Sequence, residues 1–439
     1  MTLAHRFLRN PYQSYVYAYP HKTAYRMLPA PIALDEAWAS ERRHAGFLYV
    51  HIPFCEMRCG FCNLFTRARP QAELITAYLS TLERQATRVR DAIGPIHFAR
   101  RAMGGGTPTF LDPPALHRIF DVMDHTMGAR AGLPTSAETS PETATRERLG
   151  VLRERGVDRI SIGVQSFLDA EAKHLLRPQR ATAVRGALER IRSAGFPTLN
   201  IDLMYGIPGQ NHASFEASLR AALEYHPEEI YLYPLYVRAR TGLERHAGVE
   251  PDDTRLALYR HGCAFLAGAG YERISMRMFR ARNAPSSNGP VYCCQTDGMV
   301  GLGCGARSYT TRLHYSDEYA VGARGVQEIL EAYVARTDDS FSETRYGFVL
   351  DDREQRRRFV ILSLLADGLD ARAYAMRFGG DAEHDFPELA ELVAHALAER
   401  QTDARCLTLT NAGVELSDAI GPWLASPEVR SKMALYVLR

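Results

Sequence analysis

The sequence predicts an α/β protein built as a partial barrel of six strand–helix units, followed by a smaller α+β domain. From residue 47 onward, short apolar runs alternate with longer amphipathic runs. This alternation indicates parallel strands joined by crossover helices, and six units suit a partial barrel better than a full barrel of eight. The hydrophobic pattern changes after about residue 346, where we place the start of the smaller domain.

The expected elements of the barrel follow from the spacing of the apolar residues. We expect strands at 47–54, 96–103, 136–139, 159–164, 198–204 and 229–235. We expect helices at 70–88, 114–127, 146–155, 182–193 and 214–225. In barrels of this kind the chemistry sits at the carboxyl ends of the strands, so the residues that follow each strand are the candidates for function.

Composition and charge exclude several classes of protein. The formal net charge of the 439 residues is +2, so the basic excess typical of nucleic-acid binding is missing. No run of about eighteen apolar residues occurs, and we therefore expect no membrane span. Residues 1–10 lack the pattern of a signal peptide, and a metal-binding cysteine loop requires reduced thiols. These observations favour a cytoplasmic protein.

An aromatic-rich arm precedes the barrel. Tyr15, Tyr17 and Tyr19 share one face if their stretch is an extended strand. We expect the arm to pack on the main domain, and the alternative is a lid that closes over the substrate. The expected division of the chain is therefore 1–46, 47–345 and 346–439.

Three cysteines, Cys55, Cys59 and Cys62, follow the first expected strand in a C-x3-C-x2-C array. A tight loop with this spacing can direct three thiolates to one face of an iron–sulfur cube and leave one iron open. The array is similar to the radical-SAM signature, in which the open iron binds S-adenosylmethionine (SAM) and an electron from the cluster cleaves its C–S bond. The alternatives are a zinc site or a disulfide. A zinc site usually needs a fourth ligand, and His51 is a poor one inside the expected strand.

The next two strand ends carry residues suited to a nucleoside cofactor. Successive glycines at 104–106 let the backbone approach a ligand closely, and we interpret them as the segment that holds the aminoacyl part of SAM. A plain tight turn is the alternative. Glu138 ends the third strand, where a carboxylate can accept hydrogen bonds from both hydroxyls of a ribose. Its alternative role is a surface carboxylate that caps the next helix.

Further polar residues follow the fourth strand and interrupt the fifth. Gln165 ends the fourth strand, Arg177 lies on the next helix or loop, and Asp202 lies within the fifth strand. An aspartate in an otherwise apolar strand is costly unless it is paired or binds a ligand. The forked guanidinium of Arg177 suits a carboxylate clamp. The alternative is a buried Arg177–Asp202 ion pair that only stiffens the barrel.

The order of these motifs resembles oxygen-independent coproporphyrinogen III oxidases and their wider radical-SAM relatives. The resemblance rests on HIPFC at 51–55, followed by GGGTPT, ISIGVQSF and NIDLMYGIPGQ, and it covers residues 49–307. It implies a radical-SAM partial barrel, a [4Fe-4S] cluster on the three cysteines and two SAM molecules. The family also has a tyrosine six residues before the first cysteine, which Tyr49 matches, and an aromatic residue before the third cysteine, which Phe61 matches.

The same resemblance implies a role for each candidate residue. Gly105, Gly106 and Glu138 would hold the SAM bound to the cluster, and Arg307, in a later glycine-rich segment, would lie at the adenosine. A second SAM would be held by Thr107, Gln165, Arg177 and Asp202. The residues implied in catalysis are Tyr49, Arg177 and Asp202.

Two departures from the family pattern guide the expected reaction. Leu64 stands where the porphyrinogen enzymes carry a further cysteine, and 274–279 (ISMRMF) replaces their Gly-Met-Asp-His-Phe segment. We therefore expect the second SAM to donate a methyl or methylene group to carbon of a small metabolite, as in methylase and cyclopropane-forming relatives. Oxidative decarboxylation of a porphyrinogen is one alternative, and haem binding and delivery without catalysis is another. The expected partners are a small-molecule substrate and a reducing protein such as flavodoxin or ferredoxin, and we expect a monomer.

Two later segments complete the prediction. Cys293 and Cys294 are either ordinary buried cysteines or thiols that donate a hydrogen atom or proton near the substrate. A helix is expected at 352–365, with the arginines 356–358 on its solvated face. The smaller domain resembles the winged-helix-like domain that ends the porphyrinogen enzymes. Because acids balance its basic residues, covering the substrate or packing on the barrel is favoured over DNA binding.

Overall fold

The computed structural model describes residues 2–177, 179–245, 250–285, 294–401 and 406–438. At its centre, six parallel strands of a curved sheet follow one another in the order of the sequence. They are β2 (Gly46–Ile52), β5 (Phe98–Gly105), β6 (Thr135–Thr139), β7 (Arg159–Gln165), β8 (Thr198–Tyr205) and β9 (Glu229–Pro234). The predicted α/β class with a partial barrel of six parallel strands is confirmed.

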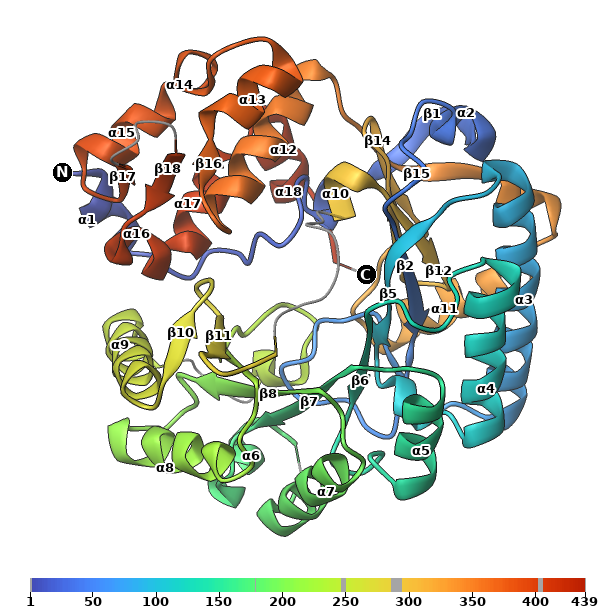
Figure 1. Cartoon of the computed structure of the whole chain (residues 1–439), viewed down its shortest axis with the longest axis horizontal. Helices are drawn as coiled ribbons and strands as arrows, with labels where there is room; N and C mark the ends of the chain where they lie inside the picture. Colours follow the sequence, from blue (N-terminus) through green and yellow to red (C-terminus); the bar gives the residue numbers. More distant parts are fainter. Residues whose placement is uncertain (1, 178, 246–249, 286–293, 402–405, 439) are drawn as a thin grey trace.

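The crossover helices lie on the outer side of the curved sheet (Figure 1). They are α3 (Ala72–Ile93), α4 (Pro113–Asp121), α5 (Arg146–Glu154), α6 (Asp169–His174), α7 (Ala181–Ser193) and α8 (His212–Leu223). Side chains fix where they begin: Asp112 caps α4 by accepting a hydrogen bond of 2.9 Å from the backbone of Ala115. α4 continues into a π-helical turn, Val122–Thr126, so the helix predicted at 114–127 is divided in two.

Alternation along each strand separates core from cavity. In β2, Leu48, Val50 and Ile52 are fully buried in the main hydrophobic core, whereas Tyr49 and His51 line a cavity inside the barrel. Parallel pairing brings the carboxyl ends of neighbouring strands to one edge, as in the pairing of Ile52 of β2 with Gly105 of β5. Polar residues at these ends therefore converge.

The sheet continues beyond the six strands to a total of thirteen. Beyond β9, the sheet adds two antiparallel strands, β11 (Met278–Ala281) and β10 (Tyr271–Arg273). Beyond β2, it adds β12 (Met299–Leu302), β13 (Arg307–Tyr309), β14 (Leu313–Ser316), β15 (Glu343–Val349) and β1 (Arg26–Ala33). β1 pairs antiparallel with β15. The sequence did not predict β1, and part of the N-terminal arm thus belongs to the main sheet.

The segment between α1 (Leu3–Leu8) and β1 is not an extended strand, so the prediction that its three tyrosines share one face is wrong. Tyr15 and Tyr17 line the cavity, with ring centroids 5.2 Å apart. Tyr19 instead lies in a second hydrophobic core, where its hydroxyl donates to Glu354 (2.5 Å). The arm therefore runs between the cavity and the C-terminal part of the chain.

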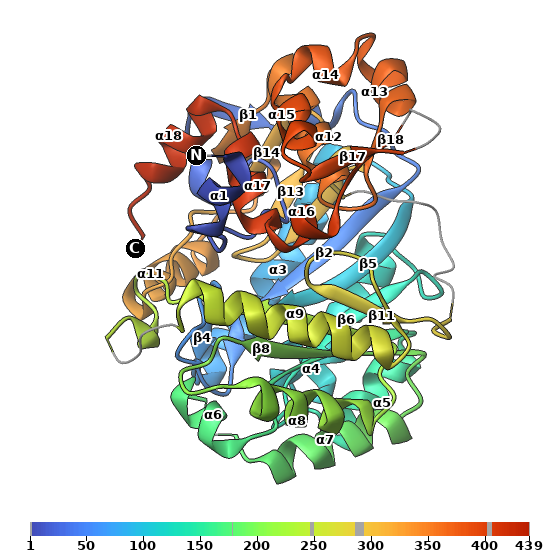
Figure 2. The ribbon, with the colours of Figure 1, turned by 90° about the vertical axis from the view of Figure 1, so that its left-hand side faces the viewer.

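The C-terminal residues form helices around a three-stranded antiparallel sheet of order β16-β18-β17. Figure 2 shows these helices, in orange and red, as a layer above the barrel, with α8 and α9 (Asp252–Gly268) below. The elements are α12 (Asp352–Leu364), β16 (Leu369–Asp370), α13 (Ala371–Phe378), α14 (Ala382–Asp385), α15 (Glu388–Ala394), β17 (Ala398–Arg400), β18 (Cys406–Leu409), α16 (Asn411–Glu415), α17 (Ser417–Leu424) and α18 (Pro427–Ala434). Their core is separate from that of the barrel and includes Phe7 of α1.

The prediction that arginines 356–358 occupy a solvated face is wrong for two of them. Arg357 and Arg358 are 5% and 2% exposed. Arg357 donates to the carbonyl of Leu424 (2.5 Å), and Arg358 donates to the carbonyl of Thr310 (3.2 Å). Both side chains therefore join α12 to neighbouring segments. Within the described part of the chain, the structure contains no helix long and apolar enough to cross a membrane.

Candidate active site

A cavity of about 780 Å³ lies at the carboxyl ends of the barrel strands. All the candidate residues for the cluster and for SAM line it: Tyr49, Cys55, Cys59, Phe61, Cys62, Gly105, Gly106, Thr107, Glu138, Gln165, Arg177, Asp202 and Arg307. Its size falls near the upper end of the range for small-molecule sites, roughly 300–1,000 Å³. The structure thus brings together side chains that are spread over more than half of the sequence.

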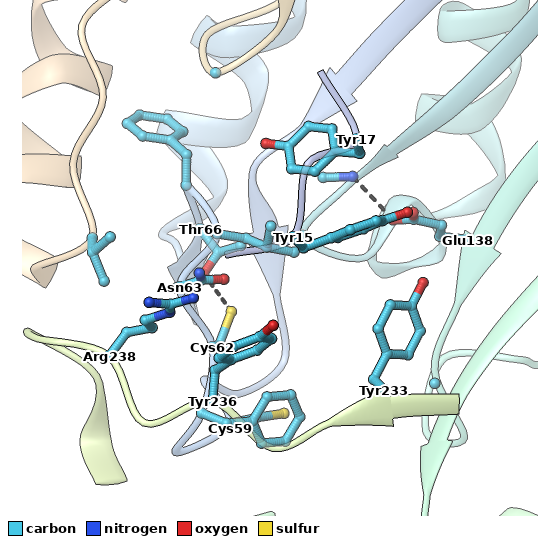
Figure 3. A pocket seen from close by; sticks show the side chains of 18 of the residues that line it. Tyr15, Tyr17, Cys59, Cys62, Asn63, Thr66, Glu138, Tyr233, Tyr236 and Arg238 are labelled. Carbon is cyan, nitrogen blue, oxygen red and sulfur yellow. Dashed lines mark hydrogen bonds between the residues drawn. The ribbon is translucent and has the colours of Figure 1, made fainter. Parts of the chain in front are cut away.

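The three cysteines lie on one loop that short strands hold at both ends. Cys55 belongs to β3 (Phe54–Cys55), which pairs with β4 (Arg67–Ala68) after the loop. Cys59 and Cys62 point into the cavity from below the tyrosines of the arm (Figure 3). All three are free thiols, so the alternative of a disulfide is wrong.

Each of the three sulfurs has a polar neighbour that can stabilise a thiolate. Thr107 donates to the Sγ of Cys55 (3.5 Å), and Arg177 donates to the Sγ of Cys59 (3.4 Å). The hydroxyl of Thr66 lies 3.9 Å from the Sγ of Cys62. Burial raises the pKa of Cys55 and of Cys59, so these thiols stay protonated until a positive partner is bound.

The arrangement suits a cluster better than a single ion. No group of three or more His, Cys, Asp or Glu side chains in the described residues is placed to hold one metal ion. A zinc site needs its ligands around one point, whereas an iron–sulfur cube presents a separate iron to each thiolate. Within the described part of the chain no fourth ligand converges on the three thiols, so this donor set suits the cube and would leave one iron open.

The glycine loop after β5 is fastened to the cysteine loop through the backbone. The N–H of Gly106 donates to the carbonyl of Ile52, and that of Thr107 to the carbonyl of Phe54, both at 2.8 Å. A Cβ on Gly106 would lie 2.6 Å from that Phe54 oxygen and 2.9 Å from the Sγ of Cys55. Only glycine fits this approach, and it leaves space beside the thiol for a ligand.

Glu138 extends from the end of β6 into the cavity. One carboxylate oxygen accepts a hydrogen bond from the N–H of Gly105 (3.1 Å). The side chain keeps contact with the open cavity, but protein surrounds it, and this burial raises its pKa to about 7. It caps no helix, since Thr145 caps α5, and the alternative role is therefore wrong. The other carboxylate oxygen can accept a hydrogen bond from a hydroxyl group of a ligand in the cavity.

Arg177 and Asp202 do not form the ion pair that the sequence left open. The three nitrogens of Arg177 donate to Gln179 (2.6 Å), to the carbonyl of Gly163 (2.6 Å) and to Cys59. Asp202 instead accepts a hydrogen bond of 2.7 Å from Asn200, and burial raises its pKa to about 6. Asp202 thus stays available to a ligand.

Gln165 stands at a strained position on the cavity wall. Its φ is +70°, a left-handed conformation that a residue with a Cβ rarely adopts, and the pairing of β7 with β8 is irregular next to it. The side-chain oxygen is buried and has no hydrogen-bond partner among the described residues. An unpaired buried acceptor of this kind points to a donor supplied by a ligand.

His51 is a cavity residue that the sequence analysis set aside. Its Nδ1 lies 3.2 Å from the hydroxyl of Tyr49, and its Nε2 lies 3.1 Å from the carbonyl of Phe65. Burial lowers the pKa of the imidazole to about 4, so it is neutral near pH 7. The two-residue spacing from Tyr49 on one strand was the signal available in the sequence.

Other lining residues come from segments whose role the sequence did not predict. Tyr15 and Tyr17 of the arm face Glu138 and Tyr233 across the cavity (Figure 3). Arg277, from the segment that replaces the family motif, stacks 3.8 Å from the ring centroid of Tyr15. The aromatic richness of the arm was visible in the sequence, but its position over the cavity was not. Cys293 lies outside the described residues, and Cys294 is the first residue of α10 (Cys294–Asp297).

Comparison with known proteins agrees with this geometry. Residues 49–222 match the model of the radical SAM superfamily, a segment that contains the cysteine loop and the ends of β5 to β8. Residues 49–222 are therefore a radical-SAM domain. This family implies a [4Fe-4S] cluster and SAM, and here the three cysteines, with Gly106 and Glu138 beside them, are the residues suited to hold them.

The chain has relatives with two kinds of name. It is 28% identical over 426 residues to the oxygen-independent coproporphyrinogen III oxidase of Paracoccus denitrificans, covering 92% of this chain and 91% of the relative. It is 26% identical over 367 residues to the heme chaperone HemW of Bacillus subtilis, covering 82% of this chain and 94% of that relative. The solved coproporphyrinogen III oxidase of Escherichia coli superimposes with a TM-score of 0.79 at 24% identity, covering 96% of this chain and 98% of that one. The last comparison shows that the fold is shared.

Proposed function

We propose that this protein is a radical-SAM oxidoreductase that removes a hydrogen atom from a carboxylate-bearing substrate and releases carbon dioxide. The observation that carries the proposal is one cavity lined together by three free thiols, the glycine that touches Cys55 and the carboxylate of Glu138. This set matches the needs of a SAM-binding iron–sulfur centre. Oxidation of a porphyrinogen propionate is the nearest model, because several relatives carry that activity in their names.

The relatives and the geometry favour oxidation over the carbon transfer expected from the sequence. No relative named above is a methylase. Arg177, expected to clamp the carboxylate of a second SAM, already donates three of its five N–H groups within the protein. A second SAM that donates carbon stays a prediction, and the number of SAM molecules is a quantity to be measured.

The chain's own residues prepare the cavity for this chemistry. The cluster and SAM, when bound, would supply the hydrogen-abstracting radical. The hydrogen bond from Gly105 fixes one oxygen of Glu138 and leaves the other for a ribose hydroxyl that SAM would supply, and the tyrosines of the arm would limit the entry of water on their side of the cavity. Neutral His51 fixes the hydroxyl of Tyr49 beside the glycine loop. Asp202, with a pKa near 6, can accept or release a proton near neutral pH.

The proposed reaction balances as an oxidation. A propionate group that loses one hydrogen atom, carbon dioxide and one electron becomes a vinyl group. The hydrogen atom ends in 5′-deoxyadenosine, and the electron passes to a one-electron acceptor. Carbon transfer would instead produce S-adenosylhomocysteine and a heavier product. The two reactions therefore differ both in the cofactor product and in the mass of the substrate product.

The test is anaerobic reconstitution with iron and sulfide, followed by incubation with SAM, reductant and coproporphyrinogen III. We expect 5′-deoxyadenosine and a product lighter by carbon dioxide and two hydrogens for each propionic acid group converted, and neither in Cys59→Ala. A product heavier by one carbon unit, with S-adenosylhomocysteine, would refute the proposal in favour of carbon transfer. Tight haem binding without turnover would refute it in favour of a haem chaperone, the role named for the relative in Bacillus subtilis.

A further inference from the structure

Two cations line the cavity on the side of the N-terminal arm. Lys22 begins the short 3-10 turn η1 (Lys22–Ala24), and Arg307 begins β13. Among the described residues, no Asp or Glu oxygen lies within 4.0 Å of the charged nitrogens of either side chain. Arg238 and His21 line the same part of the cavity.

The contacts that these cations do make are with aromatic rings. The Nζ of Lys22 lies 3.4 Å from the ring centroid of Tyr319. Arg307 donates to the hydroxyl of Tyr17 (2.6 Å), and its guanidinium carbon lies 4.9 Å from the centroid of that ring. An aromatic ring offsets the loss of water around a cation only in part, because its negative face carries no net charge.

Several arginines that are buried or partly buried elsewhere in the chain have carboxylate partners, although Arg177 has none among the described residues. Arg277 pairs with Asp418 at 2.5 Å, and Arg159 pairs with Glu229 at 2.7 Å. Burial, and after it the positive charge of Arg307, lowers the pKa of Lys22. Burial and then the charges of Lys22, Arg307 and Arg238 lower the pKa of His21, so the imidazole adds no positive charge near neutral pH.

We propose that Lys22 and Arg307 together bind an anionic group of the substrate, a carboxylate or a phosphate, and so fix which end of the substrate faces the cluster. The proposal rests on the proposed function, since it requires the substrate to enter this cavity. It assigns Arg307 to the substrate rather than to the adenosine. β13 lies on the opposite side of β2 from β6 and β8, which carry Glu138 and Asp202, and no oxygen of either carboxylate lies within 4.0 Å of the Arg307 nitrogens.

The position of the site also sets the direction of the substrate. Lys22 lies over the ring of Tyr319, whose hydroxyl donates to the carbonyl of Asn63, next to Cys62, so an anion held by Lys22 lies beside the cluster loop. The tyrosines at 15 and 17 flank the remaining space. A substrate with one anionic end would therefore place that end under the arm and its apolar part between the aromatic rings.

The test measures anion binding to the reconstituted protein by calorimetry, with inorganic phosphate and the tricarboxylate tricarballylate as separate probes. We expect at least one probe to bind the wild type, and Lys22→Met and Arg307→Gln each to weaken it about tenfold or more. Arg307→Lys, which keeps the charge, should regain most of the lost affinity. The matched control is Lys173→Met, because Lys173 is exposed on α6 and lies outside the cavity. It should bind the probe as the wild type does.

Several results would overturn the assignment. Failure of both probes to bind the wild type, or equal affinity in all variants, would remove the site. Loss of SAM affinity in Lys22→Met and Arg307→Gln, with probe binding intact, would assign the cations to SAM instead. Because an anion raises the pKa of Lys22, binding of tricarballylate should take up a proton and weaken as the pH rises above about 7, where the carboxylates of this probe are already ionised. This dependence should vanish in Lys22→Met. A merely structural role for Lys22 would leave the pH dependence unchanged.

Failure of this proposal can be told apart from failure of the proposed function. Anion binding is measured without reductant, whereas SAM cleavage is measured by the formation of 5′-deoxyadenosine. Intact cleavage with no anion binding would overturn only the anion site. Intact anion binding with no cleavage would overturn only the proposed function.

Discussion

Adding one methyl group to Gly106 tests whether the glycine loop and the cysteine loop form a single cofactor site. A Cβ at this position would lie 2.6 Å from the carbonyl oxygen of Phe54 and 2.9 Å from the Sγ of Cys55. The first atom is backbone and the second is a predicted cluster ligand, so neither can move away freely. Overpacking of this kind typically costs about 1–3 kcal/mol. We expect Gly106→Ala to lower the free energy of unfolding by this amount and to displace Cys55.

The matched control adds the same methyl group where there is space. Gly150 lies within α5, and a Cβ there would meet no atom within 4 Å. Alanine is the better helix former, so Gly150→Ala should raise the free energy of unfolding by about 0.5–1 kcal/mol. Both variants are compared with the wild type by urea unfolding.

The functional readouts are iron and sulfide per chain after anaerobic reconstitution, and the affinity for SAM. We expect Gly106→Ala to lose most of its cluster and SAM binding, and Gly150→Ala to keep both. If Gly106→Ala bound iron and SAM as the wild type does, the inference that this glycine makes room at the cluster would be refuted.

Three further predictions follow from the buried charges. Burial raises the pKa of Glu138 from 4.5 to about 7, so between these pH values the folded chain keeps a proton that the unfolded chain releases, and the free energy of unfolding falls as the pH rises. Glu138→Gln should make this fall less steep, as measured by urea unfolding at several pH values. An unchanged slope would contradict the prediction. Asp418→Asn removes the ion-pair partner of Arg277, which is 3% exposed, and should lower the free energy of unfolding by about 3–5 kcal/mol. The control is Arg324→Ala, which breaks an exposed ion pair and should lower the free energy of unfolding by only about 0–1 kcal/mol in the same urea experiment. Asp202→Asn should weaken the binding of SAM or substrate by about 1.5–3 kcal/mol, measured by calorimetry, and should keep the iron content of the wild type. Loss of iron in this variant would refute the inference that Asp202 is not a cluster ligand.

Local patterns predicted the barrel and its cofactor loop. A strand needs only a run of apolar residues and a helix only its periodicity, so the six units could be read in order. The spacing of Cys55, Cys59 and Cys62 lies within one loop, and its geometry depends little on the rest of the chain. Residues such as Glu138 could be placed at the cavity because parallel strands necessarily bring their carboxyl ends to one edge.

Contacts between distant segments were decided only by the tertiary structure. The sequence offered Asp202 as a partner for Arg177, but the guanidinium reaches Cys59 instead, a residue 118 positions away. It also placed Arg358 in solvent, whereas packing buries it.

The positions of Lys22 and Arg307 also could not be predicted from local patterns. The two cations line one cavity only because β13 joins the main sheet and the N-terminal arm runs along the cavity. Sequence by itself determined the elements and the motifs, since these depend on neighbours along the chain. Which charges are paired and which stay free for a ligand depends on the burial and distances that folding creates between segments far apart in sequence.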